Sequence, residues 1–540
     1  MTDRQCDYIV VGAGAAGCAV AGRLAERSQN RVVLIEAGGG NRHPLTVVPA
    51  TAFLASASPE RNWNFETEPV PALDGRRMRW NQGRLLGGSS SINGMIYMRG
   101  HSREYDAWRD AGCEGWGFED IIDCYRHSES SSRGANRWHG DGGPIATRPS
   151  NTQLPICNAF LDAARDAGFP VLDDLNADVD EGFGRFDINV RHGRRVSAAA
   201  GYVEPMLGRS NFTLVINALA SRVRIEGSKA VGLEVVRGGR AEFIRAEREV
   251  ILCCGAINSP QLLMLSGVGP GSHLDSLRIP VVADLPQVGA NLRNHPAYSL
   301  RYACREPVTA YRYMHPVTAA GLLLRYLFTR GGPLGESYVA QGGAMRTSPG
   351  QEIADSIVVM APALVTRGAS GQRWRDLFPD RHGFAVSVSL GRPASVGKVR
   401  LKSSRPDDHP SIYPNFLDDP TDMPRLVRAV QTMRDMMRGR AIRDMIECEL
   451  SPGAIPSGDK ALEAEIRTNL GTYSHPSGTC RMGSDPQSVV DPQLRVRGIQ
   501  GLRVADASIM PTALNACTHA PAIMIGEKCA KMISTLSSER

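Results

Sequence analysis

Residues 7–38 read DYIVVGAGAAGCAVAGRLAERSQNRVVLIEAG, and this stretch decides the fold. The apolar run at 7–12 predicts a short buried strand, the small residues after it predict a helix, and RVVLIEAG at 31–38 predicts a second strand. A strand–helix–strand unit of about 30 residues is the minimum for a right-handed parallel crossover. The stretch therefore predicts a Rossmann-type parallel sheet.

Three glycines lie in the turn between the first strand and the helix. Gly12 permits the tight turn, Gly14 lets the backbone approach a pyrophosphate, and Gly17 lets the helix pack closely against the strand. The free N–H groups and positive dipole of the helix start bind phosphates. Glu36 ends the second strand, where a carboxylate accepts hydrogen bonds from ribose hydroxyls and would repel a 2′-phosphate. The pattern favours an adenine dinucleotide other than NADP over a glycine-rich structural turn, and it does not separate FAD from NAD.

Size and composition set the broad class. With 540 residues the chain exceeds what one hydrophobic core usually serves, so we expect two domains. The net charge is +6, and the Arg and Lys residues are scattered along the chain with Asp and Glu between them. This pattern disfavours a nucleic-acid partner. None of the 12 cysteines forms a CxxC pair, so we expect reduced thiols and a cytoplasmic protein. No uncharged apolar run is long enough to predict a transmembrane segment.

The order of elements along the chain predicts a discontinuous nucleotide-binding domain. Strand-like runs alternate with turns between 211 and 256, and a strand followed by a helix returns near the carboxyl end. We expect an α/β FAD-binding domain of Rossmann type, assembled from 1–155, 195–295 and 455–540. The inserted α+β substrate domain, built on an antiparallel sheet and helices, should comprise 156–194 and 296–454.

Four further segments resemble signatures of the glucose–methanol–choline (GMC) oxidoreductase family, and the resemblance covers nearly the whole chain in family order. They are GRLLGGSSSIN at 83–93, GAINSP at 255–260 running on to SGVG at 266–269, HPSGT at 475–479, and VADASIMP at 504–511. The branch that the chain resembles is the choline-dehydrogenase-like alcohol dehydrogenases. The resemblance implies FAD as the cofactor. Some members link FAD covalently through a histidine where this chain has Ile92, which implies a non-covalent FAD here.

The resemblance also implies the positions of the cofactor contacts. Residues 87–95 should pass the pyrophosphate and the isoalloxazine ring, with Asn93 and Gly94 nearest the flavin. The backbone of Val223 should meet the adenine. Together with the glycine turn, the predicted cofactor residues are Gly12, Gly14, Ala15, Gly17, Glu36, Ala37, Arg84, Gly87, Ser91, Asn93, Gly94, Met95, Val223, Asp506, Ala507, His519 and Pro521.

Two of the 12 histidines match family positions for the chemistry. His475 lies in TYSHPSGT and His519 in NACTHAPA. A neutral imidazole accepts a hydroxyl proton near neutral pH, so we expect His475 to be the proton acceptor and His519 to stabilise the developing alkoxide. The reverse assignment stays open, because coupled imidazoles share their proton. Pro521 favours a helix that begins at about residue 520, with its positive end at the flavin.

The substrate should be a small-molecule alcohol. Choline-handling relatives use a glutamate in a segment where this chain has Gln341, and a neutral amide compensates a desolvated cation poorly. We therefore expect an uncharged primary alcohol, aliphatic or aryl, in a pocket with Gln341 and Tyr473, although Glu336 offers a substitute carboxylate. Cys517 should lie near the site as a small filler or as part of a reshaped pocket.

The reaction that we expect is oxidation of the alcohol to the aldehyde. The electron acceptor stays open among oxygen, a quinone and a soluble carrier. Two other functions stay open: a GMC-fold lyase without net oxidation, and a non-catalytic dinucleotide-binding protein. We expect no metal site.

Overall fold

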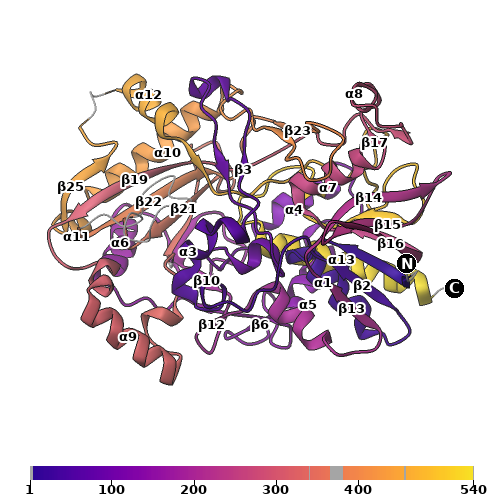
Figure 1. The fold of residues 1–540 in the computed structure, drawn as a ribbon. Coiled ribbons are helices and arrows are strands. Elements are labelled where there is room, and N and C mark those ends of the chain that lie inside the picture. Colours follow the sequence, from indigo (N-terminus) through magenta and orange to yellow (C-terminus); the bar gives the residue numbers. More distant parts are fainter. Residues whose placement is uncertain (1–3, 340, 365–380, 455–457, 539–540) are drawn as a thin grey trace.

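The fold is organised around two separate sheets (Figure 1), seen in a computed structural model that describes residues 4–339, 341–364, 381–454 and 458–538. The first sheet contains the predicted crossover. Its strands, in spatial order, are β13 (Phe212–Val215), β2 (Val32–Ile35), β1 (Arg4–Val11), β16 (Arg240–Leu252), β15 (Lys229–Arg237) and β14 (Ala218–Glu226), with β27 (Leu502–Val504) beside β16. The helix α1 (Ala15–Glu26) connects β1 to β2, which pair in parallel. The predicted Rossmann-type arrangement is therefore confirmed.

The second sheet is mainly antiparallel. Its strands, in spatial order, are β25 (Ile446–Ser451), β19 (Pro296–Cys304), β22 (Gly383–Leu390), β21 (Ser356–Ala361), β20 (Gln341–Met345), β9 (Gly182–Arg185) and β8 (Val171–Leu172), with β26 (Gly471–Thr472) beside β19. The helices α6 (Pro155–Asp166) and α10 (Asp422–Met437) bury their apolar sides against it. The expected antiparallel sheet with helices is thus also confirmed.

Buried apolar side chains form two large clusters, one mainly around each sheet. In the first cluster, α13 (His519–Ser538) packs along α1, so the end of the chain returns to the amino-terminal crossover. Gly526 allows this contact, since a Cβ there would lie 2.9 Å from Cβ of Ala19. The start of α13 at His519 is 493 residues beyond the end of α1 at Glu26, and the two helices are adjacent in space, as the discontinuous organisation requires.

The domain boundaries themselves stay a prediction. The strand β26 belongs to the segment 455–540 that we assigned to the cofactor domain, yet it pairs with β19 of the second sheet. The predicted boundary at residue 455 and the chain ends at 1 and 540 lie outside the described residues. Within the described residues, no helix combines the length and apolar character needed to cross a bilayer.

Candidate active site

A cavity of about 510 Å³ lies where the carboxyl ends of β1 and β2 meet the second sheet. Its lining includes Val11 and Ile35, the last residues of β1 and β2, and Val359 from β21. Ligands of open α/β sheets bind outside the carboxyl ends of parallel strands, because helix starts and loops face this edge. The position of the cavity therefore fits a nucleotide cofactor that reaches toward a second domain.

The predicted glycine turn lies at one end of this cavity. Gly14 lines it and immediately precedes α1, and a Cβ there would meet nothing closer than the Cys253 carbonyl oxygen at 3.9 Å. Gly12 has a φ of +96°, which a side chain would strain. A Cβ on Gly17 would clash with the Gly12 carbonyl oxygen, so Gly17 holds helix and strand together as predicted.

Glu36 is buried and lines the cavity beside the glycine turn. Its carboxylate accepts hydrogen bonds from the N–H of Ala13 at 3.0 Å and from the N–H of Gly38 at 2.7 Å. Burial raises the pKa of Glu36 to about 7, while these N–H groups act in the opposite direction. The carboxylate is thus fixed in direction before any ligand binds.

Residues 93–95 form another wall of the cavity. The Asn93 Oδ1 accepts a hydrogen bond from the Arg195 guanidinium at 2.7 Å and from the Met95 N–H at 3.1 Å. Met95 is held at a φ of +64°, an uncommon conformation for a residue with a side chain. Strained backbone of this kind is found at ligand sites, where the surrounding structure enforces it.

His475 lines the cavity and has a neighbour that sequence reasoning missed. Its Nδ1 lies 3.0 Å from Nδ1 of His295, which is buried and does not line the cavity. Asn294 fixes both residues, since its Oδ1 accepts from the backbone N–H of His475 at 2.8 Å and from that of His295 at 2.9 Å. The pairing of Pro296 with Thr472 between β19 and β26 brings these two segments together.

The surroundings of His295 favour one tautomer of His475. Burial lowers the pKa of His295 to about 4, while the backbone of Leu514 and of Gly391, whose carbonyls can only accept, acts in the opposite direction. A His295 proton directed at these carbonyls leaves the lone pair of Nδ1 to accept the Nδ1–H of His475. The Nε2 of His475 then carries a lone pair, which is the form that a base needs.

His519 is the first residue of α13 and lines the same cavity as His475. Its Nδ1 is buried without a hydrogen-bond partner among the described residues, which indicates a polar atom reserved for a ligand. Burial, helped by the charge of Arg195, lowers the pKa of His519 to about 4. Burial and the neighbouring His295 lower the pKa of His475 well below its ordinary value. Both rings are therefore neutral at neutral pH.

Residues 6–297 and 393–526 match the amino-terminal and carboxy-terminal profiles of the family described as GMC oxidoreductase. The chain belongs to the GMC oxidoreductase family. Mitochondrial choline dehydrogenase of Homo sapiens is 39% identical, over 98% of this chain and 90% of the relative. Oxygen-dependent choline dehydrogenase of Sinorhizobium fredii is 37% identical, over 98% of this chain and 95% of the relative. Pyridoxine 4-oxidase from Mesorbium loti has a similar structure, with a TM-score of 0.88, 31% identity and coverage of 98% and 99% of the two chains.

GMC oxidoreductases bind FAD, and the cavity of this one fits that cofactor. The open backbone at Gly14, the start of α1 and the fixed Glu36 carboxylate suit a dinucleotide, and the unpartnered Nδ1 of His519 suits the reacting end. Ile92 also lines the cavity and cannot form a covalent link to flavin. The protein is an FAD-dependent oxidoreductase that acts on alcohols.

Most of the predicted cofactor residues surround the cavity. Those that line it are Gly12, Gly14, Ala15, Glu36, Ala37, Asn93, Gly94, Met95, Asp506, Ala507 and His519. Those that lie outside the lining are Gly17, Arg84, Gly87, Ser91, Val223 and Pro521. Val223 is buried with its N–H donated to Ser266 Oγ at 2.8 Å, and the earlier part of its strand, residues 218–220, faces the cavity instead.

The predicted start of the last helix is close to the observed one. The helix α13 begins at His519, one residue before the predicted position, and Thr518, His519 and Ala522 line the cavity. Cys517 lines it too, and burial raises the pKa of its thiol to about 12, so it is uncharged. Cys517 therefore adds a small apolar surface next to the positive end of the helix.

The two predicted pocket residues have different positions in this GMC oxidoreductase. Tyr473 lines the cavity, and its hydroxyl donates to the Ser387 carbonyl oxygen at 2.8 Å. Gln341 is fully buried in β20 and lies outside the lining. The substitute carboxylate of Glu336 is engaged by Arg148 at 2.6 Å and lies outside the lining as well.

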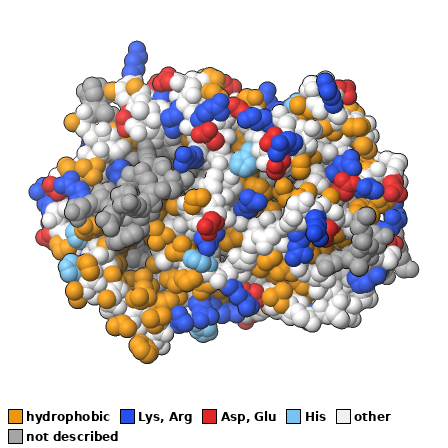
Figure 2. Space-filling model, in the orientation of Figure 1, with side chains coloured by type: hydrophobic (Ala, Val, Ile, Leu, Met, Phe, Trp, Pro, Cys, Tyr) orange, Lys and Arg blue, Asp and Glu red, His pale blue; other side chains and the backbone are white. Residues whose placement is uncertain are grey.

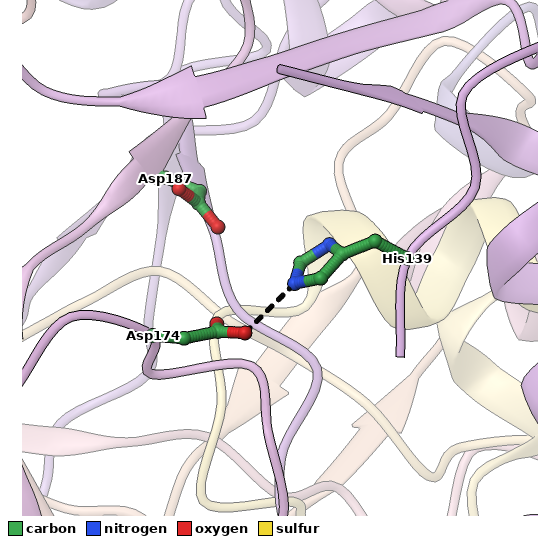
Figure 3. Close-up of side chains that lie close together, drawn as sticks. All are labelled: His139, Asp174 and Asp187. Atoms are coloured by element: carbon green, nitrogen blue, oxygen red, sulfur yellow. Dashed lines mark hydrogen bonds and ion pairs between the residues drawn. The ribbon is translucent and has the colours of Figure 1, made fainter. Parts of the chain in front are cut away.

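A second cluster of His139, Asp174 and Asp187 lies outside this cavity (Figure 3). His139 bonds through Nε2 to Asp174 at 2.9 Å and through Nδ1 to Glu129 at 3.0 Å, and Arg133 pairs with Asp187 at 3.1 Å. Burial acts to lower the pKa of His139, but these carboxylates raise it to about 9. Each of these three side chains already has a charged partner, so we interpret the cluster as a buried ion-pair network.

Proposed function

We propose that the protein oxidises an uncharged primary alcohol to the aldehyde, with His475 as the acceptor of the hydroxyl proton. Bound FAD, held without a covalent link, supplies the hydride acceptor. Loss of the O–H proton makes removal of a hydride from the carbinol carbon easier. The single observation that carries the assignment is the contact between His475 Nδ1 and His295 Nδ1, because a His475 that donates its Nδ1–H there has the lone pair of Nε2 free.

His519 has the complementary role in this proposal. Its ring is neutral and lines the cavity, so an N–H of this ring can donate a hydrogen bond to the oxygen of the substrate. The positive end of α13 and the buried guanidinium of Arg195 add a favourable potential for an alkoxide. Both groups are in place before substrate binds, so stabilising the alkoxide requires little reorganisation.

The preference for an uncharged substrate rests on the carboxylates that line the cavity, each of which already has a partner. Asp506 accepts from the Gly255 N–H at 2.8 Å and from Ser259, and Asp407 pairs with Arg405 at 2.7 Å. Asp408 accepts from Ser403 Oγ at 2.6 Å, and Glu36 accepts from two backbone N–H groups. A quaternary ammonium would find no free carboxylate among the described lining residues, whereas Tyr338, Val339 and Tyr473 offer apolar contact.

The electron acceptor in our proposal is oxygen, a quinone or a soluble carrier. We also place the protein in the cytoplasm, supported by the 12 cysteines, all of which are free. In the domain division proposed from the sequence, the glycine turn, Glu36 and Tyr473 all belong to the FAD-binding domain, and the substrate domain comprises 156–194 and 296–454.

The test is anaerobic mixing of the holoenzyme with a panel of alcohols while the flavin absorbance is followed. We expect bleaching by neutral aliphatic or aryl primary alcohols at higher efficiency than by choline, followed by a defined response to air, a soluble quinone or a dye. A higher efficiency with choline would contradict the proposed substrate class. A panel in which no alcohol bleaches the flavin would contradict the proposed oxidation and would leave the lyase as the alternative.

A further inference from the structure

The helix α9 (Pro316–Thr329) has two apolar faces, and only one of them packs on the protein. The inward stripe contains Ala319, Leu322 and Tyr326, of which Tyr326 is 2% exposed. The large apolar side chains that the helix exposes, with exposed fractions of 51–85%, are Val317, Leu323, Leu324, Leu327 and Phe328. A helix repeat of 3.6 residues puts Val317, Leu324 and Phe328 on the side away from Tyr326, with Leu323 and Leu327 along one flank. Figure 2 shows a broad hydrophobic surface where α9 lies in Figure 1.

This exposed face is carried on a well-attached helix. The Tyr326 hydroxyl donates to the Gly193 carbonyl oxygen at 2.9 Å, in the turn between β11 (Val190–Arg191) and β12 (Arg194–Arg195). The Arg330 guanidinium lies 5.2 Å from the centre of the Tyr326 ring. These specific contacts therefore hold the apolar face outward. A contiguous exposed apolar patch marks an interaction site, whereas single exposed hydrophobic residues are normal on a protein surface.

The charged side chains of α9 and of the residues next to it in sequence have one sign. Between Glu306 and Glu336 the sequence contains no acidic residue, whereas it contains Arg312, Arg325 and Arg330. The adjoining turn exposes two more arginines, Arg191 and Arg194. None of the five forms an ion pair with a carboxylate in the part of the chain that the structure describes. An apolar face with an arginine rim is complementary to a surface that is apolar inside and anionic at its edge.

We propose that α9 and the β11–β12 turn dock on the surface of an anionic lipid bilayer, with the helix axis in the plane of the interface. The five apolar side chains would enter the acyl boundary, and the arginines would contact lipid phosphates. A second copy of the chain fits less well, because a two-fold contact through this face would bring the two arginine rims together. The helix lies on the bilayer and does not span it, in agreement with its length of 14 residues.

Docking would also orient the active site. The short segment that follows α9, with η8 (Pro333–Gly335), leads to Tyr338 and Val339, which line the cavity. This wall of the cavity would then lie close to the bilayer. The proposal needs no assumption about the reaction, so its test is separate from the test of the proposed function.

The experiment is co-sedimentation of the FAD-loaded full chain with vesicles of phosphatidylcholine alone or mixed with phosphatidylglycerol. We expect binding to the mixed vesicles, weaker binding at high salt, and little binding to phosphatidylcholine alone. The double variant L327S/F328S should lower the apparent affinity by at least about tenfold, because it removes apolar area from the interface. R312Q/R325Q should weaken binding to the mixed vesicles in the same direction. Alcohol-driven flavin reduction in solution should be unchanged in both variants.

Matched controls replace exposed residues outside the face. L207S/V282S removes two apolar side chains with exposed fractions of 43% each, and R240Q/R440Q removes two exposed arginines. Both controls should bind the mixed vesicles like the wild type. The proposal is overturned if the wild type ignores both kinds of vesicle, or if the controls lose binding as much as the α9 variants. It is also overturned if L327S/F328S dissociates a dimer in analytical ultracentrifugation while vesicle binding is absent throughout.

Discussion

His295 acts on the reaction through another residue, since it touches His475 and does not line the cavity. We predict that His295→Ala lowers kcat by about 10- to 100-fold with little change in the KM for the alcohol, because the wrong tautomer of His475 becomes accessible. His295→Gln should restore part of the rate, since its carbonyl oxygen can accept the Nδ1–H of His475. Steady-state kinetics with these two variants measure the effects on kcat and on KM separately. An equal loss in both variants, or a loss confined to KM, would remove the positioning role.

Glu36 is fixed by two backbone N–H groups at the dinucleotide end of the cavity. If it binds the adenosine ribose, Glu36→Ala should weaken FAD binding by about tenfold or more, the usual cost of losing hydrogen bonds to a charged group. The flavin-to-protein ratio after gel filtration measures this. The rate of flavin reduction at saturating FAD should stay near the wild-type value. A variant that retains FAD normally but cannot turn over would argue against the ribose contact.

At the scale of elements, the crossover β1–α1–β2 depends on glycines with different tasks. A Cβ on Gly17 would clash with the Gly12 carbonyl oxygen, whereas a Cβ on Gly14 would meet nothing closer than 3.9 Å. We predict that Gly17→Ala lowers the free energy of unfolding by about 1–3 kcal/mol, as overpacking does, and lowers Tm. Gly14→Ala is the matched control and should keep the stability of the apoprotein while weakening FAD binding. Equal Tm values for the two apoproteins would contradict this division.

The sequence was informative where the signal is local. The glycine turn, Glu36 and the start of α13 depend on short-range patterns, and the structure has them close to the predicted positions. The pair His295–His475 depends on the pairing of β19 with β26, in which Ala297 pairs with Gly471, 174 residues further along the chain. The hydrophobic periodicity of a sequence does not predict a contact between segments so far apart in the chain. Gln341 and Val223 show the same limit, because which face of a strand meets the cavity depends on register and sheet packing.

At the scale of the whole molecule, the cavity is assembled from both sheets, and Ile92 in its lining cannot link to flavin. We predict that acid or heat releases free FAD, and that adding FAD back to apoprotein raises Tm with FAD concentration, as expected for a ligand that binds the native state alone. Flavin fluorescence of the supernatant after precipitation measures the release of FAD. Thermal unfolding at several FAD concentrations measures the rise in Tm. Flavin that stays with the precipitated protein would show a covalent link.

The pH dependence of the reaction follows from the directions of the pKa shifts. Burial lowers the pKa of His475 well below its ordinary value and those of His295 and His519 to about 4. The neutral ring is the active base, so the rate of flavin reduction should be level around neutral pH. It should fall only as acid protonates the coupled rings, with an apparent pKa below the ordinary 6.5 of histidine.

The central claim is that His475 accepts the hydroxyl proton, and anaerobic stopped-flow reduction of His475→Ala at saturating alcohol tests it most directly. We predict that flavin reduction slows by about 10²–10⁴-fold, the range that general-base catalysis supplies. FAD content should stay near normal, and the fall of the rate in acid should disappear from the pH profile. His519→Ala should also slow reduction, with a loss that does not add to that of His475→Ala. If His475→Ala keeps the wild-type rate and the wild-type ionisation, the proton goes elsewhere and the mechanism is wrong.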